Sequence, residues 1–233
     1  MSEILKIENL KKSFTTYHMN KTITPIENIS IDVDEGDFLG IVGKSGSGKS
    51  TIIKCIYRTY LTTEGKIEYE SEAFGRVDLS RIDDRKMIYL RNYEIGYVSQ
   101  FLNIMPRTTS LTLVVNGLLD MGYEYSEAEK IAKETLTYFD IKEELWDSYP
   151  NTFSGGEKLR LNISMAIVKK PKLLLLDEPT ASLDRDSKIK VKDSIEKLKE
   201  EGTTMIGIFH DLEFMEGLTD YIYDMQTKKK VKC

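Results

Sequence analysis

The sequence lacks the features that would place the chain in a membrane or in a secretory pathway. Its longest apolar runs, such as "KLLLLD", are strand-sized and far shorter than the roughly 20 residues of a membrane-spanning helix. The N-terminal stretch "MSEILKIENLKKSF" has no apolar core of a secretory signal. The two cysteines, Cys55 and Cys233, have no spacing typical of a metal site or a disulfide framework. We therefore expect a cytoplasmic protein that is associated with a membrane, if at all, through a partner.

An excess of positive charge is also missing. The chain has 33 Lys and Arg against 38 Asp and Glu, a formal net charge of −5. The overall charge therefore gives no attraction to nucleic acid, although a local basic patch stays open. The C-terminal stretch "TKKKVKC" is basic but has no prenylation box, so we expect a frayed, solvated end. The remaining composition, 40% hydrophobic and 30% charged in 233 residues, is ordinary for a globular protein with a sizeable core.

Strand-like and helix-like segments alternate along the chain. We predict strands at "ILKIENL", "NISIDV", "DFLGIV", "GKIEYE" (an edge strand), "EIGYVSQ", "KLLLLD" and "MIGIFH". Between about 101 and 170 the pattern is helical; "SEAEKIAKETLTYF" has one apolar stripe, and Ser126 with Glu129 predicts a capping box. A charged helix is predicted at 186–201, ending at Gly202. The alternation predicts an α/β fold whose ligand lies at the carboxyl ends of parallel strands.

The stretch "GKSGSGKST" matches the phosphate-binding pattern G-x-x-x-x-G-K-[ST] in full, and it stands between a predicted strand and a predicted helix. Its glycines let backbone N–H groups surround phosphate oxygens at a helix N-terminus. Lys49 can reach the β- and γ-phosphates, and the Ser50 hydroxyl can ligate Mg²⁺. The residues predicted to bind the nucleotide here are Gly43, Lys44, Ser45, Gly46, Ser47, Gly48, Lys49, Ser50 and Thr51.

Polar residues end three further predicted strands. Asp177 can hold Mg²⁺ through water, and Glu178 can orient or deprotonate an attacking water. Gln100 ends "EIGYVSQ", where its amide can touch the metal or its water. His210 ends "MIGIFH", where a γ-phosphate would lie. Together with the phosphate loop, these residues predict hydrolysis of a nucleoside triphosphate.

A second glycine turn, "NTFSGGEKLRL", precedes a helical pattern and predicts another anion site at a helix N-terminus. Ser154, Gly155 and Gly156 would deliver the donors. Glu157 places a carboxylate beside that anion, which the sequence does not explain. The sequence thus predicts two separate phosphate-binding turns in one chain.

In this order, "GKSGSGKST", "VSQ", "FSGGE", "LLLLDEPTASLD" and "GIFHD" resemble the motifs of ATP-binding cassette (ABC) ATPases over essentially the whole chain. The resemblance implies a P-loop NTPase of the ABC type. A RecA-like, mostly parallel core with an antiparallel β subdomain would span 1–100 and 171–233, and a helical signature subdomain would span 101–170. It also implies a head-to-tail dimer, with a second copy or a related ABC subunit, in which the signature of one subunit closes the ATP site of the other.

The same resemblance implies roles for single residues. Two positions depart from the family pattern: Glu157 stands where Gln is usual, and Met165 stands where an arginine is usual. We expect these two departures to affect packing or the interface modestly, without loss of hydrolysis. The implied set comprises catalytic Glu178, His210 and Gln100, metal ligands Ser50, Gln100 and Asp177, and ATP contacts from residues 43–51, Phe14 (on adenine, with Tyr17 as a substitute), Ser154, Gly155, Gly156, Glu157 and the D-loop Asp184.

Within the family, two subgroups compete. The text around the Q-loop and "GIFHD" resembles PhnL-type ABC subunits of the carbon–phosphorus lyase (phosphonate) pathway, which would act in ribose 1-phosphonate 5-triphosphate synthesis with other pathway proteins as partners. The alternative is the ATPase of a lipoprotein-release or macrolide-export transporter, which shares "SQF" and an N-terminal strand extension and has a membrane permease as partner. No nucleic-acid partner is expected, since the chain has no coiled coil or zinc module. We expect coupling to the partner along 101–119, an apolar stretch that contains Arg107.

Overall fold

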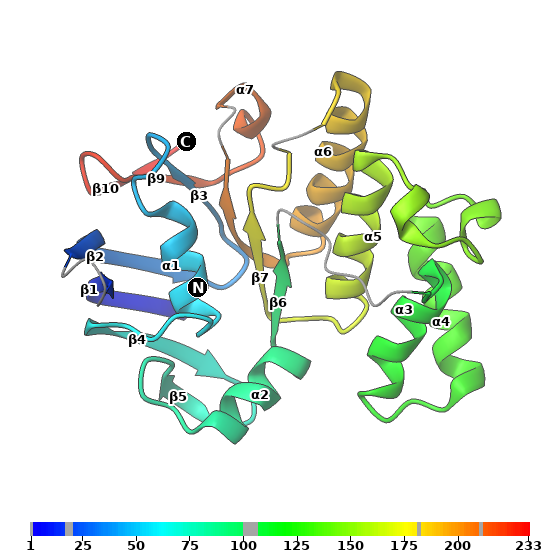
Figure 1. Cartoon of the computed structure of the whole chain (residues 1–233), viewed down its shortest axis with the longest axis horizontal. Coiled ribbons are helices and arrows are strands. Elements are labelled where there is room, and N and C mark those ends of the chain that lie inside the picture. Colours follow the sequence, from blue (N-terminus) through cyan, green and yellow to red (C-terminus); the bar gives the residue numbers. More distant parts are fainter. Residues whose placement is uncertain (1, 17–20, 100–106, 181–182, 210–211) are drawn as a thin grey trace.

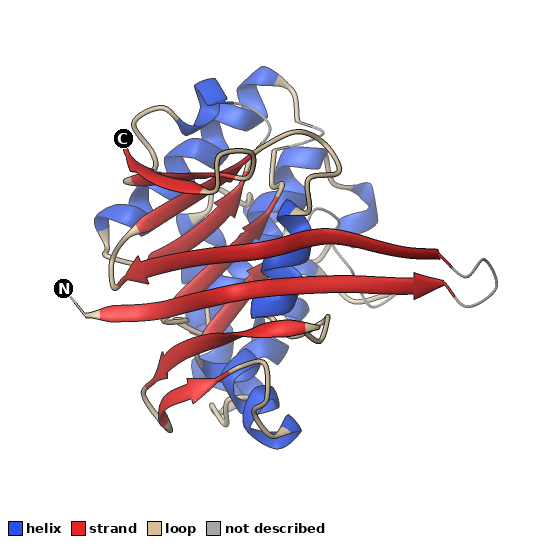
Figure 2. Ribbon diagram, turned by 90° about the vertical axis from the view of Figure 1, so that its left-hand side faces the viewer, coloured by secondary structure: helices blue, strands red, loops and turns tan. Residues whose placement is uncertain are grey.

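Two β-sheets organise the computed structural model, which describes residues 2–16, 21–99, 107–180, 183–209 and 212–233 (Figures 1 and 2). The first sheet is antiparallel with the order β2-β1-β4-β5. Its strands are β1 (Glu3–Thr16), β2 (Lys21–Asp34), β4 (Glu64–Ser71) and β5 (Gly75–Asp78). The prediction that "GKIEYE" is an edge strand is wrong, because β5, a strand that the sequence pattern did not reveal, pairs with the outer side of β4.

The second sheet has the order β10-β9-β3-β8-β7-β6. Its strands are β3 (Phe38–Val42), β6 (Ile95–Val98), β7 (Leu173–Asp177), β8 (Thr204–Ile208), β9 (Tyr221–Asp224) and β10 (Lys229–Lys232). All neighbouring pairs from β9 to β6 are parallel, and only β10 runs antiparallel to its neighbour. The predicted α/β class, with a mostly parallel sheet beside an antiparallel one, is confirmed.

The helices follow the predicted segments with two additions, α2 and the short α7. The helix α2 was not predicted because only Met87 and Leu90 of it are buried, too few for a clear apolar stripe. Asp83 starts it by accepting a hydrogen bond from the Arg85 N–H at 2.9 Å. The helices are α1 (Lys49–Ile56), α2 (Asp84–Tyr93), α3 (Ser110–Leu119), α4 (Tyr125–Tyr138), α5 (Gly155–Ile167), α6 (Arg185–Glu200) and α7 (Leu212–Met215), with 3₁₀ turns at Glu143–Leu145 and Pro150–Thr152.

The start of α4 corrects a detail of the sequence interpretation. Its N-cap is Glu124, whose side chain makes no capping hydrogen bond, so the capping box predicted at Ser126 is wrong. Because the helix begins one residue before Ser126, that serine lies inside the first turn and not in the extended backbone that a cap requires. The predicted stripe is confirmed, with Ala128, Ala132 and Leu136 fully buried.

The basic C-terminal end is also ordered, contrary to the expectation of a frayed tail. It forms β10 on β9, and the Lys230 ammonium lies 2.7 Å from a carboxylate oxygen of Asp32 on β2. Lys228 donates to the Glu27 carbonyl at 2.8 Å, and the Cys233 N–H donates to the Asp220 carbonyl at 2.9 Å. The lysines therefore join the two sheets, which a count of charges could not indicate.

The faces of the parallel sheet carry different helices. Leu173 and Leu175 of β7 belong to the core cluster that includes α1, whereas Leu174 and Leu176 belong to the cluster that includes α5 and α6. In Figure 1, α1 and α5 accordingly lie on opposite sides of β6 and β7. A third cluster joins α3, α4 and α5, within the stretch 101–170 for which a separate helical subdomain remains a prediction. Among the described residues, no helix is long and apolar enough to cross a membrane.

Candidate functional site

The predicted phosphate loop connects the carboxyl end of β3 to the start of α1. Gly48 caps α1 with φ +91°, in the left-handed region that favours glycine. A Cβ there would lie 2.6 Å from the Pro25 carbonyl oxygen and 2.4 Å from Cγ2 of Ile26. Both the backbone conformation and the close approach of β2 therefore require glycine at this position.

Lys49 folds back into this loop. Its side chain donates to the carbonyls of Gly43 at 2.9 Å and Lys44 at 3.1 Å, and only 4% of the residue is exposed. The helix α1 begins without a side-chain cap, which leaves backbone N–H groups at its N-terminus for an anion. The Ser47 hydroxyl is buried and has no hydrogen-bond partner among the described residues. A cation, helix N–H groups and an unsatisfied hydroxyl together suit a phosphate group.

Asp177 ends β7 at the same edge of the sheet, since β3, β8 and β7 are parallel. One of its oxygens, Oδ2, accepts a hydrogen bond from the Tyr97 hydroxyl at 3.0 Å. The other, Oδ1, is buried and unpartnered among the described residues, and Asp177 is only 5% exposed. Burial and the charge of Asp177 raise the pKa of Tyr97, so its hydroxyl remains a donor at neutral pH. A buried, unsatisfied carboxylate oxygen fits a divalent cation or its water.

Glu178 leaves the strand with a left-handed backbone. Its φ is +53°, a conformation that costs a non-glycine residue about 1–3 kcal/mol and that clusters at functional sites. The side chain is half-buried. Asp177 is the last residue of the strand, and Glu178 has the left-handed backbone that follows it. The different backbone conformations of the two adjacent carboxylates are compatible with two separate roles.

The second glycine turn starts α5 with a capping box. Oε2 of Glu157 accepts hydrogen bonds from the backbone N–H and the hydroxyl of Ser154, both at 2.8 Å, and the Glu157 N–H donates to Ser154 Oγ at 3.3 Å. Burial raises the pKa of Glu157, but the hydrogen bonds from Ser154, together with the charges of Arg160 and Lys142, outweigh it and hold the pKa below its ordinary value. The carboxylate that the sequence left unexplained therefore has a structural role, because it closes the N-terminus of this helix.

This lowered pKa leads to a prediction for Glu157→Gln. The ionised carboxylate stabilises the fold above its ordinary pKa near 4.5, and this stabilisation is lost as the pH falls through the lower pKa of the folded state. We expect the variant to be less stable at pH 7 by about 0.3–1 kcal/mol, the usual worth of a charge at a helix N-terminus. Urea unfolding at pH 7 and at about pH 3 measures the difference, which should shrink at the lower pH. An equal difference at both pH values would contradict the prediction.

Asp184 and the signature turn meet at one residue of α6. Asp184 caps α6 by accepting from the Ser187 N–H at 2.9 Å and the Ser187 hydroxyl at 3.0 Å, and these bonds lower its pKa. A Cβ at Gly156 would lie 2.8 Å from Cβ of Ser187. The structure thus brings the predicted D-loop residue and the predicted signature together.

Several predicted residues are not tested by this geometry. Gln100 and His210 lie outside the described residues, as do Tyr17 and the first part of the predicted coupling segment, 101–106. Phe14 is half-exposed on β1, with its ring edge-on to Tyr60 at 5.1 Å between centroids. Its contact with adenine stays a prediction. Met165 packs against the cluster of α3, α4 and α5, which suits an apolar side chain.

Two contacts near the site were missed from the sequence. Asn162 of α5 donates to the Ser99 carbonyl at 3.0 Å and so links the signature helix to the residue before Gln100. Tyr97 hydrogen-bonds Asp177, as described above. The only signal in the sequence was a polar group in an apolar segment, "LNISMAI" or "IGYV", and only the fold reveals its partner.

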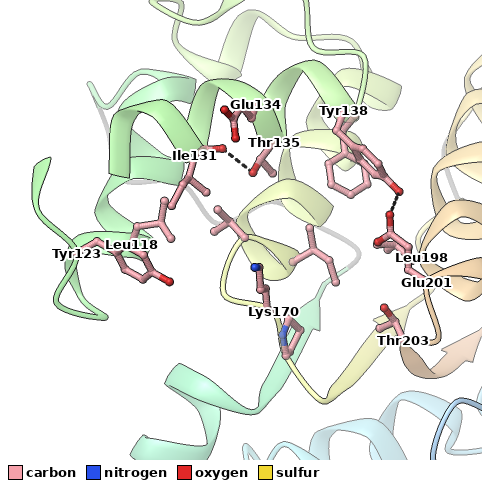
Figure 3. A pocket seen from close by; sticks show the side chains of 14 residues that line it. Leu118, Tyr123, Ile131, Glu134, Thr135, Tyr138, Lys170, Leu198, Glu201 and Thr203 are labelled. Atoms are coloured by element: carbon pink, nitrogen blue, oxygen red, sulfur yellow. Dashed lines mark hydrogen bonds between the residues drawn. The ribbon is translucent and has the colours of Figure 1, made fainter. Parts of the chain in front are cut away.

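A cavity of about 490 Å³ lies away from these residues, between α3–α5 and the C-terminal end of α6 (Figure 3). The Tyr138 hydroxyl donates to Glu201 at 2.8 Å across one side of it. None of the predicted nucleotide-binding residues lines it, so its size does not make it the nucleotide site. Its lining is Leu118, Tyr123, Ile131, Glu134, Thr135, Tyr138, Phe139, Ile167, Val168, Lys170, Pro171, Leu198, Glu201 and Thr203.

Comparison with known proteins decides the family. The family model described as "ABC transporter" matches residues 26–181, from the first sheet through the phosphate loop and signature to just beyond β7. The chain belongs to the ABC transporter family. This ABC protein is therefore an ATP-binding cassette and an ATPase.

Its relatives cover it nearly end to end. It is 33% identical over 231 residues to the lipoprotein-releasing system ATP-binding protein LolD of Aquifex aeolicus, covering 99% of this chain and 97% of that protein. It is 32% identical over 223 residues to LolD of Geobacter metallireducens, covering 95% and 94%. Among solved structures, a dimer of the ATP-binding cassette MJ0796 in a post-hydrolysis state with ADP and Pi matches with a TM-score of 0.87, at 28% identity and 98% coverage of both chains.

These relatives bear on the two subgroups expected from the sequence. No phosphonate-pathway subunit is among those described above, and the ABC family is supported without the narrower PhnL resemblance. The names of the relatives favour the lipoprotein-release alternative.

Proposed function

We propose that this ABC ATPase is the motor subunit of a membrane transporter of the lipoprotein-release or macrolide-export type. Two ABC subunits would close head-to-tail around two ATP molecules and open again after hydrolysis. The partner would be a second copy or a related ABC subunit, and a membrane permease would receive the motion.

The proposal of a dimer rests on the positions of two incomplete phosphate-binding sites, the phosphate loop and the signature turn. The phosphate loop starts α1 on one face of the parallel sheet, and the signature turn starts α5 on the other face. The phosphate loop and the signature turn of one chain therefore do not surround the same phosphate. In a head-to-tail pair, Ser154 and Gly155 of one subunit would meet the γ-phosphate held by the partner's phosphate loop, and the dimeric cassette MJ0796 supports such a pairing.

The residues described above would divide the chemistry of hydrolysis. Lys49 and the N–H groups of α1 would bind the phosphates, and Ser50 and Asp177 would hold Mg²⁺. The ion, when bound, neutralises charge on the β- and γ-phosphates. Glu178 would take the proton from the attacking water. Gln100 and His210 would contact the water and the γ-phosphate, as their family resemblance implies.

The transporter assignment draws on the relatives and on the long N-terminal strands. LolD proteins match the chain over almost all of its length. The strands β1 and β2 are 14 residues each and form an extended hairpin (Figure 2), in keeping with the N-terminal extension expected for this subgroup. The helix α3 exposes Leu119 at the end of the predicted coupling stretch.

Co-purification tests the assignment. The full chain, tagged at its exposed C-terminus and expressed at native level in its own host, is isolated from detergent-solubilised membranes and from the soluble fraction. We expect an integral membrane permease as the stable partner, retained through a wash of moderate salt. Recovery with soluble phosphonate-lyase proteins and no permease would overturn the transporter assignment in favour of the phosphonate alternative.

A further inference from the structure

Tyr97 makes a contact that the motifs do not account for. It lies on β6, which runs parallel to β7, and it stands opposite Leu175 in the register of the two strands. Asp177 is two residues further along β7 than Leu175, so its side chain points to the same face. The Tyr97 hydroxyl reaches it and donates to Oδ2 at 3.0 Å.

This bond makes the two oxygens of Asp177 unequal. Oδ2 has a neutral donor, whereas Oδ1 is buried without a partner among the described residues. A carboxylate with neither oxygen bonded could turn about its terminal torsion, and the bond to Oδ2 restricts that rotation. Outer contacts of this kind commonly set the affinity of a metal site without touching the ion.

Tyr97 is itself held by its neighbours. Its ring stacks on Tyr57 at the C-terminal end of α1, with 4.8 Å between centroids and 27° between planes. The guanidinium of Arg91 lies 4.8 Å from the Tyr57 ring centroid, and its Nε donates to the Tyr57 carbonyl at 2.9 Å. These contacts, which run from Arg91 on α2 through Tyr57 at the end of α1 to Tyr97 on β6, therefore fix the position of the Tyr97 hydroxyl.

We propose that Tyr97 is a positioning residue, which holds Asp177 by Oδ2 so that Oδ1 faces the divalent cation of the bound nucleotide. The inference rests on the Mg²⁺ site of the proposed function. It predicts that the Tyr97 hydroxyl affects the dependence of nucleotide binding on Mg²⁺ and leaves metal-free binding almost unchanged.

Titration of a fluorescent ATP analogue into the full chain tests this. Dissociation constants are measured in EDTA and across a series of free Mg²⁺ concentrations, so that no turnover is required. For Tyr97→Phe, which keeps the ring and its stack, we expect the Mg²⁺ concentration for half-maximal enhancement of binding to rise about 10-fold. The dissociation constant in EDTA should stay within about twofold, because Mg²⁺ is absent there. Tyr57→Leu, which removes the stack, should shift the Mg²⁺ curve in the same direction.

Two controls separate the possible failures. Tyr93→Phe removes a hydroxyl that donates to the Asp120 carbonyl outside the site and should leave the Mg²⁺ curve in place. Asp177→Asn should abolish the Mg²⁺ enhancement. If Asp177→Asn shifts the curve and Tyr97→Phe does not, or if Tyr97→Phe weakens binding equally in EDTA, the positioning role is overturned. If Asp177→Asn leaves the curve unchanged, the proposed Mg²⁺ site itself fails.

Discussion

Replacing Glu178 with glutamine should leave ATP bound and almost unhydrolysed. The amide keeps the size of the side chain and the turn at φ +53°, but it cannot take a proton from water. Loss of a general base commonly costs about 100-fold or more in rate. We expect turnover in the complex with the proposed membrane permease to fall by at least this factor, while the affinity for ATP stays near that of the wild type.

The measurement combines phosphate release by the complex with a fluorescent-nucleotide titration of the isolated chain. Glu200→Gln is a matched control, since it makes the same chemical change at an exposed position at the end of α6. ATP should also accumulate a dimer of the Glu178→Gln chain on size-exclusion chromatography, or of its mixture with the partner ABC subunit. Near-normal phosphate release would remove Glu178 from its proposed role.

Replacing Lys49 with alanine should weaken the binding of the nucleotide itself, a step that precedes hydrolysis. The side chain is buried in the loop and donates to two carbonyls among the described residues, so the ammonium group lies where phosphate oxygens can replace or join them. Each charge-assisted hydrogen bond that is lost costs about 1.5–3 kcal/mol, or roughly 10- to 100-fold in dissociation constant. Fluorescent-ATP titration in the presence of Mg²⁺ measures this effect directly.

Lys130→Ala provides the matched control for Lys49→Ala. It removes the same charge from an exposed position on α4, distant in the fold from the phosphate loop, and should leave the dissociation constant unchanged. Circular dichroism of the Lys49→Ala chain without nucleotide separates loss of binding from loss of folding. An unaltered affinity in a folded Lys49→Ala chain would contradict the assignment of the loop.

The parts of the molecule that depend on local chemistry were predictable. The strand–loop–helix geometry of the phosphate loop was predictable because its requirements lie within a few residues. Gly48 allows a left-handed turn, and Lys49 places a cation beside a helix N-terminus. The buried strand "KLLLLD" was predictable because both of its faces are covered, and all five residues of β7 are buried. The Gly202 stop after α6 was likewise local, with φ +81° directly after the C-cap.

One of the errors arose where residues depend on a distant part of the chain, and another at the start of a helix. The tail lysines were expected in solvent, but Lys230 pairs with Asp32, 198 residues earlier. The Ser126 capping pattern satisfied the sequence rule, yet the helix begins at Tyr125. For the tail, a short pattern described the preferences of the residues and not the neighbours that the fold supplies. For α4, the pattern identified the helix but not the residue at which it starts.

The sequence by itself determined the α/β class, the order of the motifs and the chemical groups available for phosphate, metal and water. The class follows from the alternation of local patterns along the chain, and each motif with its chemical groups lies within a few adjacent residues. Only the tertiary structure decided that the two glycine turns start helices on opposite faces of one sheet and that Tyr97 fixes one oxygen of Asp177. The reason is that a hydrogen bond or a shared face between distant segments depends on strand register and packing, which a linear pattern of residue types does not contain.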